Sequence, residues 1–199
     1  DKHADCMIYD DAIYYHGQHI INLDEIKIVG KHNIQNMMIA IVACVLSGVS
    51  LEDIHYTLAN FKGVEHRIEF VREYQGVKYY NDSKGTNTDA AMIALKAFDK
   101  PVILLMGGFE KGLDLSELST YQDSLSTLIC FGAAKDRFAK DMKCPNTIVV
   151  NCMKDAVLKA KEIAKEGDVV LLSPSTSSFD EFDGYEERGR VFKEIVNAF

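Results

Sequence analysis

The chain has 199 residues, 47% of them hydrophobic and 26% charged, the composition of a globular protein with one large or two small domains. Its formal net charge of −8 excludes a general nucleic-acid-binding or membrane-surface protein, although local cationic pockets are compatible with it. No apolar run reaches the roughly 18 residues that a membrane-spanning helix needs, and no signal peptide is visible. Five scattered cysteines without a Cys-x-x-Cys pair favour free thiols in a reducing cytoplasm.

The first thirty residues predict short β-strands separated by turns, at residues 6–9, 12–15, 19–23 and 26–29. Two helices are predicted next. An apolar one covers residues 34–46 with Asn33 as its N-cap, and another covers 51–60 with Ser50 and Asp53 as a capping pair. Sixty residues bury little core by themselves. Because the chain also opens on Asp1 in the middle of a β pattern, we expect a fragment or a processed chain.

From residue 77 onward, strand-like and helix-like patterns alternate five times. The strands are predicted at 77–81, 102–106, 128–131, 147–150 and 169–173, and the helices at 89–98, 116–124, 133–142, 154–165 and 185–198. Gln75-Gly76 is a hairpin signature that joins a further strand, 68–74, to the first of these. The pattern predicts an α/β fold with a Rossmann-like, doubly wound, mostly parallel sheet, preceded by β-hairpins and two helices. We place the domain boundary between residues 62 and 63.

Polar, glycine-rich loops follow four of these strands, at residues 82–88, 107–114, 132–135 and 173–180. In a parallel sheet such loops emerge at one edge, where ligands bind. Helix N-termini and the ammonium groups of Lys84 and Lys111 would favour an anion there. Taken alone, each loop also fits a structural interpretation: a turn at Gly107-Gly108, a solvated Lys111, or serines that bond their own backbone. The shared edge favours a binding site.

Several motifs are absent. The sequence has no Walker-type phosphate loop and no Gly-x-Gly-x-x-Gly after a strand, so it carries no phosphate cradle of its own. The six histidines lack zinc-ligand spacing, and we assign no metal-binding residue. His66-Arg67 lies at the predicted domain junction, where a structural role and a phosphate-binding role are equally compatible with the sequence.

Four segments together resemble the Mur ligase family, in its D-glutamate-adding branch. Residues 81–87 (NDSKGTN), 107–114 (GGFEKGLD) and 173–189 (SPSTSSFDEFDGYEERG) resemble its C-terminal domain, and residues 30–36 (GKHNIQN) resemble the end of its central ATPase domain. The Asp-Ser-Lys-x-Thr-Asn signature is specific to that branch. Gly85 departs from a common alanine, and Ser175-Thr176 depart from small apolar residues or cysteine; neither change removes an implied ligand.

The resemblance implies part of an ATP-dependent amide ligase that adds D-glutamate to UDP-N-acetylmuramoyl-L-alanine through an acyl phosphate, in peptidoglycan precursor synthesis. Residues 1–62 would end the central ATP-binding domain, and residues 63–199 would form the amino-acid-binding domain. ATP and Mg²⁺ are the implied cofactors, with the P-loop and the magnesium ligands outside this sequence. The resemblance further implies a cytoplasmic bacterial monomer that binds neither nucleic acid nor membrane, and a chain that is inactive alone.

Matched by position, the resemblance implies roles for ten residues. Those at the D-glutamate site would be Lys84, Thr86, Lys111, Ser178 and Tyr185; those facing the nucleotide would be Asn33, Asn36, Arg67 and Asp82; and His66, with Lys84, would lie near the reacting groups. Two alternatives stay open: a non-catalytic Rossmann-like module that binds an amino acid or nucleotide, and a ligase fragment of the folylpolyglutamate synthase type. L-Glutamate should compete at least as well as D-glutamate in the second.

Overall fold

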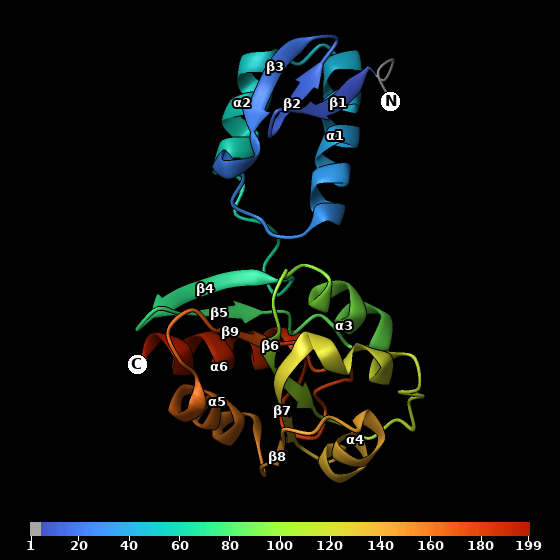
Figure 1. The fold of residues 1–199 in the computed structure, drawn as a ribbon, viewed down its shortest axis with the longest axis vertical. Helices are drawn as coiled ribbons and strands as arrows, with labels where there is room; N and C mark the ends of the chain where they lie inside the picture. The colour runs from blue at the N-terminus through green and yellow to red at the C-terminus, as the bar shows by residue number, and fades with distance from the viewer. Residues whose placement is uncertain (1–4) are drawn as a thin grey trace. The chain divides into compact units, whose positions relative to one another are not determined.

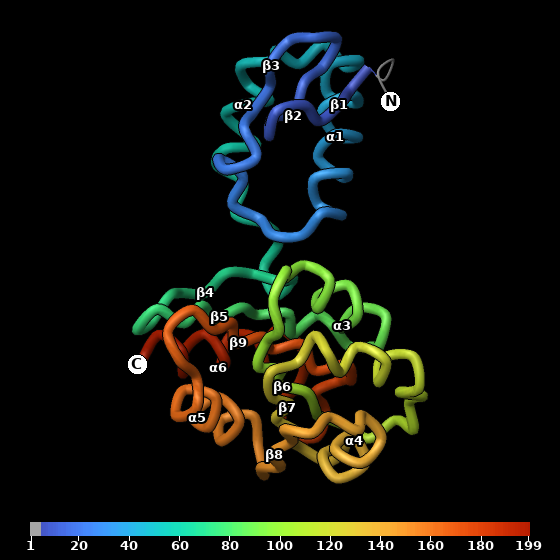
Figure 2. Tube along the Cα trace, viewed as in Figure 1, coloured from blue at the N-terminus to red at the C-terminus, as the bar shows by residue number. Residues whose placement is uncertain are grey.

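The computed structural model describes residues 5–199 as two compact units, which divide between Gly63 and Val64. Each unit has a sheet and a hydrophobic core of its own, and a single chain crossing joins them (Figure 1; the same trace is drawn as a tube in Figure 2). Within residues 5–199, no helix is both long and apolar enough to cross a membrane. All five cysteines are free thiols, and none is exposed.

The first unit is a three-stranded antiparallel sheet covered by two helices. Its elements are β1 (Cys6–Tyr9), β2 (Ala12–Tyr15), β3 (Gln18–Asn22), the 3₁₀ turn η1 (Leu23–Glu25), α1 (Lys31–Leu46) and α2 (Leu51–Asn60). The predicted hairpins are confirmed, because residues 10–11 and 16–17 turn with positive φ between paired strands. Ile13 and Ile21 of the sheet pack with Met37 and Ile41 of α1 to form the core.

Two predictions for this unit are wrong. The strand expected at residues 26–29 is absent, since η1 ends the meander and an irregular segment follows it. Asn33 is not an N-cap: α1 already starts at Lys31, after Gly30 with φ 100°, and the Asn33 side-chain amide donates a hydrogen bond of 2.7 Å to the Val29 carbonyl. The cap of α2 is confirmed, because Ser50 Oγ accepts the backbone N–H of Asp53 at 3.1 Å.

The second unit is built on a six-stranded sheet with the order β4-β5-β9-β6-β7-β8. The strands are β4 (Glu69–Tyr74), β5 (Val77–Asn81), β6 (Val102–Gly107), β7 (Leu125–Phe131), β8 (Thr147–Val149) and β9 (Val169–Leu172). Only β4 is antiparallel to its neighbour, joined to β5 by a tight turn at Gln75-Gly76, where both φ values are positive. The predicted Rossmann-like, mostly parallel sheet is confirmed.

Helices cover both faces of this sheet (Figure 1). α3 (Thr88–Leu95), η2 (Leu118–Ser124) and α4 (Lys135–Met142) lie on one face, while α5 (Met153–Ile163) and α6 (Tyr185–Asn197) lie on the other. The apolar strands β6 and β9 are buried along their whole length, as expected for strands covered on both sides. Phe192 of α6 and Val157 of α5 pack against Leu105 and Val170 in the core.

The α-helix predicted at residues 116–124 is wrong, because this segment forms the 3₁₀ element η2 with a kink at Tyr121. The hydroxyl groups of its serine and threonine residues explain the difference. Ser119 Oγ donates to the Ser116 carbonyl and Thr120 Oγ1 donates to the Glu117 carbonyl, each at 2.7 Å. Such side chains compete with the backbone for helical carbonyl groups.

Candidate functional site

The loops after β5, β6, β7 and β9 meet at the carboxyl edge of the sheet, as the sequence predicted. Gly107 N–H donates to the Pro174 carbonyl at 3.1 Å, Phe109 N–H to that of Ser177 at 2.9 Å, and Ser175 N–H to that of Gly85 at 2.9 Å. The loop after β7 joins them, because Ala134 N–H donates to the Gly108 carbonyl at 2.9 Å. Four segments distant in the sequence therefore form one hydrogen-bonded rim.

Glycine is needed at one point of this rim. Gly108 has φ 135°, and a Cβ atom there would lie 2.3 Å from the Ser177 carbonyl oxygen and 3.2 Å from Arg188. A side chain at this position would push the β6 and β9 loops apart. The glycine pair therefore serves close loop packing as well as the turn.

A buried arginine that the sequence reasoning missed fastens the first loop to the last. Arg188, in the first turn of α6, donates from Nε to Ser83 Oγ (2.9 Å), from Nη2 to the Ser83 carbonyl (2.8 Å) and from Nη1 to the Thr176 carbonyl (3.1 Å). Its side chain is fully buried, and burial lowers its pKa to about 10, so it stays cationic at neutral pH. A signal was available, since Arg188 lies four residues before Phe192 on the apolar stripe of α6.

Asp82 joins the backbone at Ile68, near the start of the second unit, to the loop after β9. Its Oδ1 accepts the backbone N–H of Ile68 at 3.2 Å and its Oδ2 accepts the Ser173 hydroxyl at 2.7 Å, with only 4% of the residue exposed. Burial is the main cause that raises its pKa to about 6. Both carboxylate oxygens are thus engaged inside the fold, and a contact with nucleotide stays a prediction.

The raised pKa of Asp82 gives a testable pH dependence. Because the folded pKa is about 6 against the ordinary 3.8, the stabilisation linked to this group is complete below about pH 4 and is lost as pH rises through 6, by about 3 kcal/mol. Asp82→Asn should remove this loss. Urea unfolding at pH 4 to 7.5 should show wild type falling relative to the variant by that amount. The exposed control Asp99→Asn should give a constant difference, and a constant difference for Asp82→Asn would contradict the assignment.

His66 is buried in a polar network. Asn81 Oδ1 accepts the Ser83 N–H at 3.1 Å and its Nδ2 donates to Glu69, which orients the amide so that Nδ2 also donates to His66 Nδ1 at 3.0 Å. Burial is the main cause that lowers the His66 pKa. A neutral imidazole that accepts at Nδ1 and packs against Gly189 is a structural group in this unit. Its nearness to reacting groups stays a prediction.

The side chains of Glu65, His66 and Glu69 lie close enough together to hold a metal ion. A protein cation already pairs with both carboxylates, however. Lys193 Nζ lies 2.6 Å from Glu65 Oε1 and 3.0 Å from Glu69 Oε1. This cluster is an ion-pair network.

Lys84 lies in the first loop, beside Tyr185. The backbone N–H of Lys84 donates to the His66 carbonyl at 3.0 Å, and its exposed ammonium group is 5.8 Å from the centre of the Tyr185 ring. Ser83 Oγ donates to the Tyr185 carbonyl at 2.8 Å, which ties this loop to the start of α6. Thr86 is half-buried just before α3. Cation, hydroxyl and helix N-terminus together suit an anion.

The last loop supplies hydroxyl groups that lack partners. Ser175, Ser177 and Ser178 have buried Oγ atoms that form no hydrogen bond with the described part of the chain. Most buried polar atoms in proteins are paired, so such groups are expected where a polar ligand binds. Lys111, exposed, follows Phe109 by two residues, and Phe109 pairs with Ser177. The structure therefore places the Lys111 loop directly beside the serine loop.

The remaining predicted residues are placed as follows. Arg67 is exposed at the start of the second unit, next to buried His66. Asn33 and Asn36 belong to the first unit, one helical turn apart on α1, with Asn33 half-buried and Asn36 exposed. Both asparagines lie in the first unit, so the structure does not test their predicted contact with the nucleotide.

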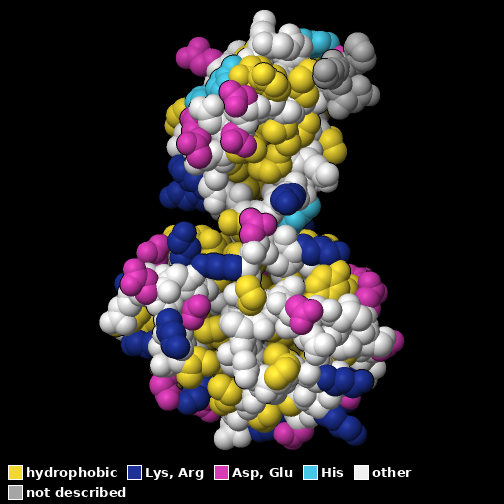
Figure 3. Space-filling model, in the orientation of Figure 1, with side chains coloured by type: hydrophobic (Ala, Val, Ile, Leu, Met, Phe, Trp, Pro, Cys, Tyr) yellow, Lys and Arg dark blue, Asp and Glu magenta, His cyan; other side chains and the backbone are white. Residues whose placement is uncertain are grey.

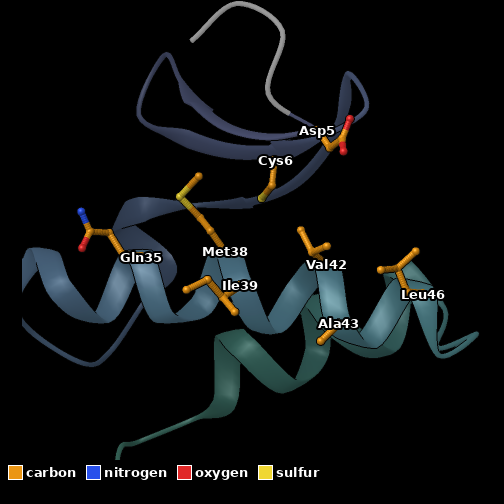
Figure 4. Close-up of a pocket in the computed structure, with 8 residues that line it drawn as sticks. All are labelled: Asp5, Cys6, Gln35, Met38, Ile39, Val42, Ala43 and Leu46. Atoms are coloured by element: carbon orange, nitrogen blue, oxygen red, sulfur yellow. The ribbon is translucent and has the colours of Figure 1, made fainter.

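The first unit also carries an apolar groove of about 710 Å³ between β1 and α1 (Figure 4). It is lined by Asp5, Cys6, Gln35, Met38, Ile39, Val42, Ala43 and Leu46. Ile39 and Leu46 are 69% and 77% exposed, and hydrophobic side chains gather on this unit in Figure 3. A lining that is apolar apart from Asp5 and Gln35 suits packing against an apolar surface better than it suits catalysis.

Comparison with known proteins assigns the family. The model of the "Mur ligase, glutamate ligase domain" matches residues 66–176, more than half of the sequence. The chain belongs to the Mur ligase family. Resemblance and geometry agree here, since the matched segment carries three of the four loops and the first half of the fourth, residues 173–176.

Two curated relatives of this Mur ligase family member carry the same name. The chain is 43% identical to the UDP-N-acetylmuramoylalanine–D-glutamate ligase of Caldicellulosiruptor bescii over 199 residues, covering 96% of this chain and 44% of that protein. It is 41% identical to the ligase of the same name from Staphylococcus aureus strain N315 over 193 residues, covering 96% of this chain and 43% of that protein. The chain thus spans less than half the length of these relatives.

Solved structures of the family share the fold. The UDP-N-acetylmuramate-alanine ligase of Thermotoga maritima superposes with a TM-score of 0.65 at 15% identity, over 94% of this chain and 42% of that one. The MurF ligase of Thermotoga maritima, in complex with ADP, gives 0.62 at 17% identity, over 98% and 46%. At these identities the likeness shows the fold alone.

Proposed function

We propose that this chain is the C-terminal part of an ATP-dependent amide ligase that adds D-glutamate to UDP-N-acetylmuramoyl-L-alanine in peptidoglycan precursor synthesis. The observation that carries the proposal is the rim. Backbone hydrogen bonds join the Lys84 loop and the Lys111 loop to the serine loop at one sheet edge, and the serine loop carries buried hydroxyl groups without a partner among residues 5–199. The shared name of the curated relatives supports this substrate class.

The rim matches the chemistry of D-glutamate, which carries two carboxylates and one amine. Lys84 and Lys111 would each bind a carboxylate, because charge-assisted hydrogen bonds to ammonium groups are stronger than neutral ones. The Ser178 hydroxyl and the backbone at Tyr185 would complete one carboxylate site, and Thr86 the other. Binding would satisfy the Ser178 Oγ, which is buried without a partner among residues 5–199.

The proposed reaction transfers phosphate from ATP to the substrate carboxylate, and the amine of D-glutamate then attacks the acyl phosphate. A tetrahedral intermediate collapses to the amide and releases phosphate beside ADP. The residues of this chain would hold the amine in reach of the acyl carbon, which accelerates such a step by positioning. Mg²⁺ would supply neutralisation of phosphoryl charge.

We propose ATP and Mg²⁺ as cofactors, with few nucleotide contacts from this chain. Exposed Arg67 suits a phosphate contact, and Asn33 and Asn36 suit the adenine side. Asp82 suits an indirect role, because its oxygens are engaged with Ile68 and Ser173. We expect a cytoplasmic monomer in which this chain alone does not hydrolyse ATP.

Residues 1–62 are proposed to end the central ATP-binding domain and residues 63–199 to form the amino-acid-binding domain. The exposed apolar side of α1 supports the first assignment. A helix that is apolar on nearly every side is normally buried, yet only Met37 and Ile41 of α1 are buried here. The groove in Figure 4 would pack against the remainder of that domain.

Titration of the isotope-labelled chain with D-glutamate tests the proposal. We expect chemical-shift changes at the amide groups of Lys84, Lys111 and Ser178, since the side chains of these residues would contact the ligand. We expect no change at Lys78, which lies on the same strand as Asn81. L-Glutamate is the control ligand, and equal or stronger shifts with it would favour a folylpolyglutamate synthase-type ligase. Unchanged spectra well above millimolar D-glutamate would contradict the proposal.

A further inference from the structure

One guanidinium group, that of Arg137 on α4, holds the loop that carries Lys111. Arg137, on α4, donates from Nε to Glu110 Oε2 and from Nη2 to Glu110 Oε1, both at 2.8 Å. Its Nη1 donates to the Leu113 carbonyl at 2.8 Å and to Asp141 at 3.1 Å. The contacts to Glu110 and Leu113 lie on either side of Lys111 in the sequence, so Arg137 braces the loop across that lysine.

The rest of the loop depends on the same carboxylate. Gly112 N–H donates to Glu110 Oε1 at 2.6 Å, so Glu110 turns the chain back immediately after Lys111. Gly112 itself has φ 67°, a conformation that glycine adopts more readily than residues with a side chain. Arg137 thus holds both arms of this glycine-containing loop, through bidentate hydrogen bonds to Glu110 and one hydrogen bond to the Leu113 carbonyl.

The charge of Glu110 gives the brace a second effect. Glu110 precedes the lysine that would bind a substrate carboxylate, and an unpaired negative charge there would repel that carboxylate. The hydrogen bonds that Arg137 donates to Glu110 are the main cause that lowers the Glu110 pKa and the main cause that raises the Arg137 pKa. The pair therefore stays ionised and mutually neutralised at neutral pH.

An exposed ion pair usually contributes little to folding. Here both side chains are about one-third exposed, but the guanidinium makes four directed contacts, one of them to a backbone carbonyl within the loop. Such a network restricts geometry even where it adds little stability. Its expected effect is therefore on the position of Lys111 rather than on the free energy of unfolding.

We propose that Arg137 is a positioning residue for the amino-acid site: it sets the conformation of the Lys111 loop and neutralises Glu110, so that Lys111 can bind a substrate carboxylate. This inference rests on the proposed function, because it takes Lys111 as a ligand of the incoming amino acid. Asp141 contributes indirectly by orienting the guanidinium.

Steady-state kinetics of the full-length ligase carrying this segment decide the proposal. Arg137→Gln should raise the KM for D-glutamate roughly tenfold while kcat and the KM for ATP change less than about threefold. Adding Glu110→Gln should recover part of the loss, because it removes the charge that Arg137 had neutralised. If Arg137 only held the shape of the loop, adding Glu110→Gln would not lower the raised KM, and the neutralising role would be wrong. Lys140→Gln, an exposed cation on the same helix, is the matched control and should behave as wild type.

Amide hydrogen exchange at Gly112 in the chain itself reports the brace independently of any substrate, and should accelerate in Arg137→Gln but not in Lys140→Gln. Unchanged exchange, or an unchanged KM for the amino acid, would overturn the proposal. If the wild-type ligase adds L-glutamate and rejects D-glutamate, the proposed function fails, and the same KM comparison made with L-glutamate still decides the role of Arg137.

Discussion

Replacing Arg188 with alanine is expected to lower the free energy of unfolding of the second unit by about 3 kcal/mol. The guanidinium is fully buried and bridges two loops through Ser83 and Thr176. Its removal leaves two carbonyl groups and a hydroxyl without a donor and opens a cavity beneath the rim. Buried acceptors that lose a partner account for most of the cost.

An opposing term limits the loss. Burial is the main cause that depresses the pKa of Arg188 to about 10 from 12.5, which corresponds to a net cost of roughly 3 kcal/mol for holding the charge, and alanine recovers it. Three hydrogen bonds from a charged donor contribute roughly 1.5–3 kcal/mol each, and the cavity adds to their loss. The hydrogen bonds and the packing therefore outweigh the desolvation.

Urea unfolding followed by circular dichroism measures the effect. Arg190→Ala, an exposed arginine on the same helix, is the control and should change the free energy by less than about 0.5 kcal/mol. Arg188→Met tests the reasoning further, because methionine fills much of the cavity but leaves Ser83 and Thr176 without donors. If Arg188→Met were as stable as wild type, the three hydrogen bonds would do no more than offset the cost of burying the charge.

The sheet could be predicted from the sequence because its signals are local. Runs of apolar residues such as those in β6 and β9 identify strands buried on both faces, and the polar loops between them identify the ligand edge. The wrong predictions concern places where two local structures compete, and a hydrophobic pattern does not decide between them. Gly30 starts α1 before Asn33 can cap it, and the hydroxyls of Ser119 and Thr120 turn a helical pattern into a 3₁₀ element.

Part of the candidate site could be predicted from the sequence, and part of it could not. Loops carrying Lys84, Lys111 and Ser178 were predicted to meet because the topology of a parallel sheet brings them together. The contacts of Arg188 and Asp82 could not be predicted, because each joins segments about 90 or more residues apart: Arg188 reaches Ser83, and Asp82 accepts from Ser173. Buried polar contacts of this range leave no periodic signal in a sequence.

Lys84→Ala in the full-length ligase is expected to lower kcat/KM for D-glutamate at least about a thousandfold. Arg188 and Asn81 hold Ser83 from two sides, and Gly85 bonds to Ser175, so the backbone on both sides of Lys84 is fixed while its ammonium stays exposed. A cation on a rigid loop is already positioned for an anion, and little ordering cost remains on binding. Alanine removes the charge without disturbing that backbone.

The matched control is Lys78→Ala, because Lys78 is an exposed lysine on β5, the strand that leads into the same loop. It should retain wild-type turnover, which separates the loss of one positioned ammonium from a general change in net charge. Lys84→Arg distinguishes the two functions of the side chain. Arginine keeps the charge but moves it outward, so a partial rescue would point to electrostatic attraction, whereas no rescue would point to placement of the carboxylate. Near-normal kcat/KM in Lys84→Ala would remove Lys84 from the site, and with it the main cation of the first loop.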